Sequence, residues 1–169
     1  MDHDLLDLLL ALDGIQQDPR WHPEGDALFH SLQAFDLARR DTDDRELQAA
    51  ALLHDVGKAL GSADHAESGA DLLEGLVTPR VVWLVRHHLD LLDAPGATKR
   101  RLRGSPALAD LQRLRRWDVR GRSPHASVLA PDAALALLLD GAELGVLSLQ
   151  PGVWGQSPHR DSHGGKDPS

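Results

Sequence analysis

The sequence contains no cysteine and no tyrosine, and aromatic residues make up only 4% of the chain. The absence of cysteine excludes disulfide bonds, thiolate zinc sites, iron–sulfur clusters and a cysteine nucleophile. The scarcity of aromatic residues disfavours an all-β fold, because strands are rich in aromatic and β-branched residues, whereas the leucine and alanine that dominate here favour helices. Because the chain has no cysteine, any metal ion must be held by His, Asp and Glu.

Long apolar runs and an excess of positive charge are also missing. No apolar run approaches the ~20 residues that cross a bilayer, and Asp2, Asp4 and Asp7 interrupt the N-terminal leucines, so neither a membrane partner nor a secretory signal is expected. The net charge of −8 disfavours strong binding to nucleic acid. A basic stretch over residues 99–122 is either a local phosphate-binding surface or a solvated helix face. We expect a cytoplasmic protein.

The spacing of apolar residues predicts an all-α fold with no strand. Capping residues, glycines and prolines place seven helices over residues 5–12, 27–40, 45–60, 64–76, 80–92, 107–119 and 131–142. Asp26 is expected to cap the second helix, and Pro95 with Gly96 to end the fifth. Residues 1–150 are expected to form one domain. Residues 151–169 are rich in Gly, Pro and Ser without apolar periodicity, which predicts a disordered tail.

The ten histidines, against a single methionine, are the most informative feature of the composition. Five separate predicted helices each carry a possible metal ligand, namely His30, the adjacent His54 and Asp55, His65, His88, and Asp118. Metal sites in helical proteins are built from facing helices in this way. The adjacent pair lies within an otherwise apolar segment, where an ionised carboxylate is costly to bury without a cation or a hydrogen-bonding partner. We therefore expect this pair to bind metal.

Three motifs resemble those of the HD superfamily of metal-dependent phosphohydrolases. Residues 53–58, Leu-His-Asp-Val-Gly-Lys, match the central His-Asp motif, and residues 22–30 and 117–122 are similar to the first and last motifs in the HD domain of bacterial tRNA nucleotidyltransferases. The resemblance covers roughly residues 19–122. It implies a compact helical bundle of about six to seven helices. It also implies a divalent metal ion held by His30, His54, Asp55 and Asp118.

Two further segments, residues 65–70 and 85–89, are similar to those of HD proteins that hold a second ion. The resemblance implies that His65, His88 and a bridging Asp55 bind this ion, with His87 as the alternative to His88. A mononuclear site, in which these histidines are structural, is the competing interpretation. The ligand types suit Mn, Fe, Ni, Co, Zn or Mg and do not choose among them.

The resemblance implies hydrolysis of a phosphomonoester or phosphodiester, of a nucleotide or related small molecule, by a metal-activated water. Asp55 and Lys58 would be catalytic. Lys58 is expected to contact phosphate or to form a salt bridge, and Arg86 and Arg122 are weaker candidates for binding the phosphate. The alternatives are a di-iron HD-type oxygenase and a non-catalytic nucleotide-binding sensor. Because no nucleotidyltransferase head precedes these motifs, CCA addition is not expected.

Several polar residues near the motifs are expected to lie outside the site. Glu24 follows a proline and is expected to form a turn. His22, His87 and His125 are expected to be hydrogen-bonded structural residues, since an isolated histidine in an apolar setting is more often structural than a ligand.

Overall fold

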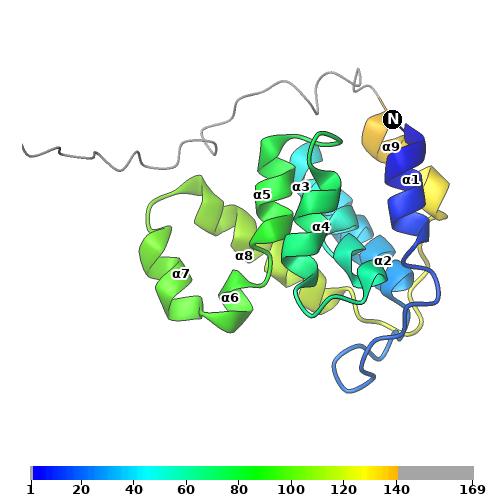
Figure 1. Ribbon diagram of the computed structural model, residues 1–169, viewed down its shortest axis with the longest axis horizontal. Coiled ribbons are helices and arrows are strands. Elements are labelled where there is room, and N and C mark those ends of the chain that lie inside the picture. Colours follow the sequence, from blue (N-terminus) through cyan, green and yellow to red (C-terminus); the bar gives the residue numbers. More distant parts are fainter. Residues whose placement is uncertain (1, 141–169) are drawn as a thin grey trace, which may run out of the picture.

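The computed structural model describes residues 2–140, in which every regular element is a helix (Figure 1). The elements are α1 (Asp2–Leu10), α2 (Ala27–Asp41), α3 (Arg45–Leu53), the 3-10 helix η1 (Val56–Leu60), α4 (His65–Leu73), α5 (Pro79–Arg86), α6 (Asp90–Asp93), α7 (Pro95–Arg101), α8 (Pro106–Arg120) and α9 (Pro131–Leu139). The predicted all-α fold is confirmed. The predicted domain end at residue 150 and the predicted tail lie outside the described residues.

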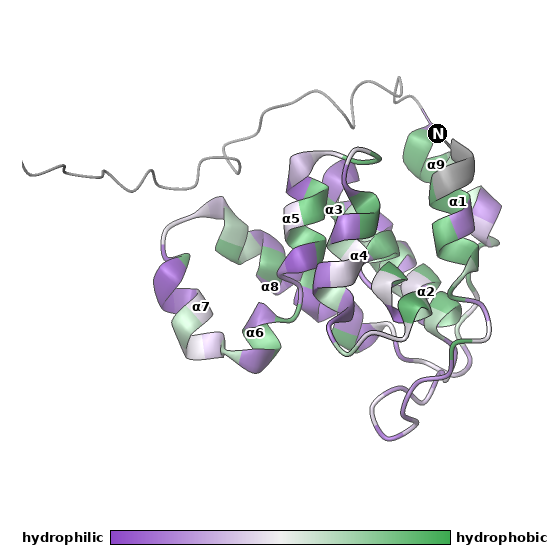
Figure 2. Cartoon of the chain, in the orientation of Figure 1, coloured by the Kyte–Doolittle hydropathy of each residue, from purple (hydrophilic) through white to green (hydrophobic). Residues whose placement is uncertain are grey.

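The core forms where the central helices bury their apolar faces against one another. Helix α2 packs on α3 and α8, α3 packs on α5, and α4 packs on α5 and η1, while α1 pairs with α9. Figure 2 shows hydrophobic residues gathered between these helices and hydrophilic residues toward the outside. The largest fully buried side chains include Phe35, Leu47, Leu52, Leu53, Leu84, Leu111 and Leu114. This core holds α2, α3, α5 and α8 rigidly beside one another.

Helix starts follow the capping rules that the sequence suggested. The carboxylate of Asp26 accepts a hydrogen bond from the backbone N–H of Phe29, so the predicted cap of α2 is confirmed. Asp44, Thr78 and Ser105 cap α3, α5 and α8 in the same way. The longest helices, α2 and α8, have 15 residues each. Across residues 2–140, no helix combines the length and the apolar character of a membrane span.

The predicted helix over residues 45–60 is wrong in its second half. Helix α3 ends at Leu53, His54 and Asp55 form a turn, and η1 follows until Gly61, whose φ of 64° lies in the left-handed region. Neighbouring side chains of an α-helix point about 100° apart. The turn instead lets His54 and Asp55 both face the same cluster of side chains.

The predicted helix over residues 80–92 is also interrupted. Helix α5 ends at Arg86, His87 and His88 leave the helix, and α6 begins only at Asp90. Pro95 was expected to end a helix, but it begins α7, because proline fits the first helical position, where no N–H is required. The interruption after α5 directs His88 inward, where only 4% of its surface is exposed.

Candidate metal centre

The six side chains predicted as metal ligands come from different elements and meet at one place. His30 lies near the start of α2, Asp118 in the last turn of α8, and His65 in the first turn of α4. The pair His54 and Asp55 occupies the turn after α3, and His88 lies just beyond α5. All of them are buried except His65, which is partly exposed.

Four of these residues form the first cluster. Nε2 of His30 lies 3.2 Å from Oδ1 of Asp118, 3.3 Å from Nε2 of His54 and 3.7 Å from Oδ2 of Asp55. Nε2 of His54 lies 3.3 Å from the same oxygen of Asp55. The ligand atoms of His30, His54 and Asp55 all lie within 4.8 Å of one another, and Asp118 joins them through its contact with His30. These are the four residues predicted to hold the first ion.

The second cluster uses the other oxygen of Asp55. Oδ1 of Asp55 lies 3.2 Å from Nε2 of His65 and 3.7 Å from Nε2 of His88. The ligand atoms of these three residues all lie within 4.8 Å of one another. Asp55 is therefore shared, with Oδ2 facing the first cluster and Oδ1 facing the second.

Backbone carbonyls fix the orientation of three of the histidine rings. In each ring Nδ1 lies within hydrogen-bond distance of a carbonyl oxygen, at 2.8 Å from Gly121 for His30, 2.9 Å from Ala51 for His54 and 2.6 Å from Val85 for His88. A carbonyl can only accept, so the proton of each neutral ring is on Nδ1, and Nε2 presents a lone pair to the clusters.

This arrangement leaves buried nitrogen atoms that fit a cation. Nε2 of His88 is buried and has no hydrogen-bond partner within the described residues. Two neutral rings cannot hydrogen-bond through the facing Nε2 atoms of His30 and His54, which require a cation or a proton between them. The described residues thus contain His and Asp clusters that are able to hold divalent metal.

In the metal-free protein, the residues of the two clusters shift one another's pKa values. Burial alone would lower the pKa of His30, but hydrogen bonds to Asp118 and Glu24 outweigh it and raise the pKa to about 9. Burial alone would raise the pKa of Asp55, but the charge of His54 and hydrogen bonds from the surrounding histidines hold the pKa well below its usual range. The pKa of Asp118 is lowered in the same way, mainly by the hydrogen bond from His30. Both carboxylates are therefore ionised and ready to bind a cation.

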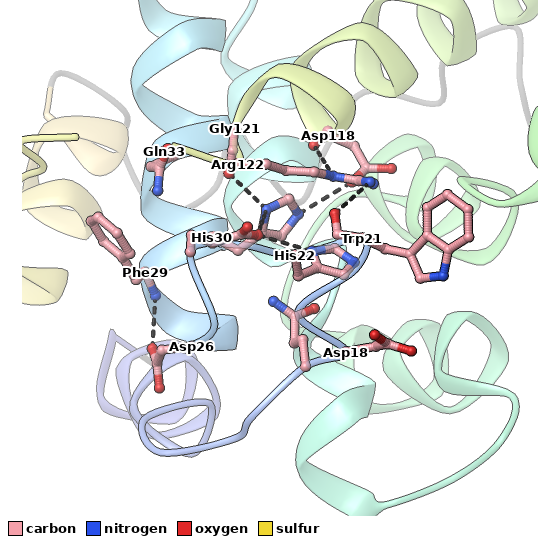
Figure 3. A network of polar contacts seen from close by, with 12 residues as sticks. Asp18, Trp21, His22, Asp26, Phe29, His30, Gln33, Asp118, Gly121 and Arg122 are labelled. Atoms are coloured by element: carbon pink, nitrogen blue, oxygen red, sulfur yellow. Dashed lines mark hydrogen bonds and ion pairs between the residues drawn. The ribbon is translucent and has the colours of Figure 1, made fainter. Parts of the chain in front are cut away.

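A cleft of about 870 Å³ opens onto these ligands and is lined by three cationic side chains. Nζ of Lys58 lies 2.6 Å from Oδ2 of Asp55, as the 3-10 geometry of η1 places residues three apart on one face. Nη2 of Arg122 lies 3.0 Å from Oδ1 of Asp118 (Figure 3). Nη1 of Arg115 lies 2.8 Å from Oδ2 of the same carboxylate. Lys58 and Arg122, two of the predicted phosphate-binding candidates, thus line the cleft, together with Arg115, which was not predicted.

Two predicted candidates are not brought to this cleft. Arg86 faces α4, where its guanidinium pairs with Glu67, Asp71 and Glu74, so its placement does not support a phosphate-binding role. His87, the alternative to His88, points elsewhere, with Nδ1 2.9 Å from Asp90 and its ring 4.5 Å from that of Trp83. His88 is therefore the residue that fits the second cluster.

Glu24 was expected to lie outside the site, and the structure places it beside a ligand. Its Oε1 lies 2.9 Å from Nδ1 of His30 and 2.9 Å from Nδ1 of His22, and the side chain is buried. Hydrogen bonds from these two histidines outweigh the effect of burial and lower the pKa of Glu24. The sequence signal that could have found it is the position of His22 and Glu24 in the motif before His30.

Gln17 is a further residue of the cleft that the sequence did not indicate. Its Oε1 lies 2.5 Å from Nζ of Lys58, so the amide and Asp55 hold the ammonium between them. Gln17 lies in an irregular loop, where no periodicity or motif marks it.

Comparison with known proteins agrees with this geometry. The profile of the HD domain matches residues 28–123, an interval that contains both clusters. A "Multifunctional CCA protein" of Halorhodospira halophila is 41% identical over 95 residues, covering 47% of this chain and 23% of that protein. One of the same name from Hahella chejuensis is 38% identical over 85 residues, covering 46% and 20% respectively. The chain thus spans about a quarter or less of the length of these relatives. Since the family profile matches more than half of the chain, the chain belongs to the HD domain family, within the superfamily of metal-dependent phosphohydrolases.

Proposed function

We propose that this chain is a metal-dependent phosphohydrolase that hydrolyses a phosphomonoester or phosphodiester of a nucleotide or related small molecule. The observation that carries the proposal is the shared carboxylate of Asp55. Its Oδ2 lies 3.3 Å from Nε2 of His54, and its Oδ1 lies 3.2 Å from Nε2 of His65. A carboxylate between two ligand clusters suits a pair of divalent ions, which is a common arrangement in phosphate-ester hydrolases.

Each cluster has a separate role in this proposal. His30, His54, Asp55 and Asp118 would hold one ion, and Asp55, His65 and His88 would hold the other. When bound, such ions lower the pKa of water to form a nucleophile and neutralise charge on phosphoryl oxygens. The backbone carbonyls behind the histidine rings keep Nε2 directed at the ions before any ligand binds, so little reorganisation is needed.

The cationic side chains of the cleft would bind the phosphate group. Lys58, Arg115 and Arg122 each contact a ligand carboxylate, so they lie beside the place where a phosphoryl oxygen would approach the ions. For Lys58 the structure has a salt bridge to Asp55, and the contact with phosphate is the proposed addition. The two roles are compatible, because an ammonium group donates three hydrogen bonds.

A screen for phosphate-ester hydrolysis tests the proposal. The purified protein, first with the metal that it retains on purification and then with added divalent ions, should hydrolyse some members of a set of nucleotides, sugar phosphates and nucleotide phosphodiesters. Released phosphate reports cleavage of monoesters, and chromatography of the products reports cleavage of diesters. Asp55→Ala should abolish hydrolysis. Asp13→Asn, at an exposed carboxylate away from the clusters, should retain it. Absence of hydrolysis across the set, or iron-dependent oxygen consumption by the wild-type protein, would overturn the proposal.

A further inference from the structure

Trp21 is exposed to an unusual degree for a tryptophan. Its exposed fraction is 65%, the highest of the exposed large hydrophobic residues in the described part of the chain. Tryptophan is normally buried over most of its surface, and an exposed aromatic side chain beside a site often marks a binding surface. The core therefore does not explain the position of this indole.

The backbone of Trp21 is nevertheless held in place. Its N–H donates to the carbonyl of Asp18 at 3.1 Å, and Nη1 of Arg122 donates to its carbonyl at 3.0 Å. In Figure 3 the indole extends away from His30 and Arg122, so the network fixes the backbone and leaves the ring free. Arg122 also contacts Asp118, a member of the first cluster. One arginine thus sets the position of Trp21 relative to the metal centre.

The cleft that contains Trp21 is lined by two chemically different groups of residues. One group consists of cluster residues and cations, including Asp55, Lys58 and Arg122. The other group is apolar, and two of its members are largely exposed, Leu92 at 52% and Val119 at 46%. Inorganic phosphate would use only the polar group. The apolar group suits a ligand that also has an apolar part.

We propose that Trp21 determines substrate specificity by stacking on a planar aromatic part of the substrate, such as a nucleobase, while the phosphate group lies at the metal centre. This inference rests on the proposed function and names the part of the substrate that the ligand clusters do not reach. A flat indole face favours a flat ring, because stacked aromatic rings gain energy beyond the burial of area. Leu92 and Val119 would cover the remaining apolar surface of that ring.

Two phosphonates that differ by one ring test the inference by calorimetric titration of the metal-containing protein. 3-Phenylpropylphosphonate and propylphosphonate share the anionic group and the linker, and their P–C bond is not hydrolysed, so binding is measured without turnover. We expect the ring to strengthen binding to the wild-type protein roughly tenfold, the effect of one stacking contact. In Trp21→Ala this preference should fall to less than about twofold, while Trp21→Phe should retain most of it.

The matched control is Leu137→Ala, which removes a similarly exposed apolar side chain from α9 and should leave the ring preference unchanged. An unchanged melting temperature of Trp21→Ala would show that its fold is intact, as expected for an exposed side chain. If Trp21→Ala keeps the full ring preference, the inference is wrong even if the protein hydrolyses phosphate esters. If the preference depends on Trp21 but no ester is hydrolysed, Trp21 stacks on a ring of a bound ligand and the proposed function fails.

Discussion

Oε1 of Glu24 lies 2.9 Å from Nδ1 of His30, while Nε2 of the same ring lies 3.2 Å from Asp118 in the first cluster. The buried carboxylate therefore orients the ring of His30 from behind, and it would increase the electron density on Nε2, the atom proposed to bind metal. Carboxylate–histidine pairs of this kind strengthen metal binding in many proteins.

Glu24→Gln should weaken metal binding about 10- to 100-fold, because the amide keeps the shape but removes the charge behind His30. Competition with a fluorescent chelator measures the affinity. Glu74→Gln is the control, since Glu74 is exposed and its carboxylate pairs with Arg86, outside the two clusters. Equal affinities of the wild-type protein and Glu24→Gln would show that the contact with His30 has no role in metal binding.

Metal affinity should rise with pH until about pH 9. The pKa of His30 is raised to about 9 in the metal-free protein, so below that pH a metal ion must displace a proton from the ring. Asp55 and Asp118 release no proton in this range, because their lowered pKa values keep them ionised. The apparent dissociation constant should fall about tenfold per pH unit between pH 7 and 9 and then level off. A constant value from pH 7 to 9 would contradict this assignment.

The raised pKa of His30 should make the metal-free fold less stable as pH rises, whereas metal binding should become tighter. A raised pKa means that the folded chain binds the proton of His30 more tightly than the unfolded chain does. This contribution is fully present below about pH 6.5 and is lost as pH rises through about 9. Urea titrations of the chelated protein at pH 6.5 and 9 should therefore show a lower free energy of unfolding at the higher pH. An increase would mean that the protonated ring is not stabilised by its carboxylates.

Gly57→Ala should disturb the second cluster before the first. A Cβ at Gly57 would lie 2.0 Å from the carbonyl oxygen of His65 and 2.7 Å from the backbone nitrogen of Gly69, so η1 and α4 would have to move apart. We expect a loss of stability of about 1–3 kcal/mol and weaker binding of the second ion. Denaturant unfolding and metal titration measure the two effects. Gly96→Ala is the control, because its Cβ would meet only the flexible end of Arg100 at 3.5 Å.

Arg122 and Arg86 should differ in their effect on catalysis. Arg122→Gln should raise KM for a phosphate ester severalfold, because it removes a cation from the cleft and a contact with Asp118. Arg86→Gln should leave KM unchanged, since Arg86 pairs with carboxylates of α4 outside the cleft. Steady-state kinetics on the substrate found by the screen measures both. A larger rise in KM for Arg86→Gln than for Arg122→Gln would reverse this assignment.

The sequence predicted much of the fold because its signals were local. The cap at Asp26 and the prolines at the starts of α8 and α9 depend on neighbouring residues alone, and they were placed correctly. The turn at His54 and Asp55 could not be predicted in this way. The surrounding alanines and leucines favour a continuous helix, and the break accompanies the close packing of Gly57 against α4, which is a tertiary contact.

The candidate site was predictable where residue type and motif coincided. The six candidate ligands could be named because buried His and Asp require a partner, and the HD motif indicated which ones, and the structure brings these residues together. The residues behind the ligands were missed, because the contact of Glu24 with His30 depends on the path of a loop. The prediction that Arg86 binds phosphate is not supported by its position, for a similar reason. It is adjacent in sequence to the ligand-bearing turn, but the last turn of α5 directs it toward α4.

Asp55 is proposed to join two metal sites, and the number of metal ions bound per chain is the decisive measurement of this shared role. Elemental analysis of the dialysed protein should give about two divalent ions per wild-type chain, about one for His65→Ala or His88→Ala, and none for Asp55→Ala. His125→Ala, at an exposed histidine away from the clusters, should keep the wild-type content. A wild-type protein that saturates with one ion, and keeps it unchanged in His65→Ala and His88→Ala, would contradict the shared role of Asp55.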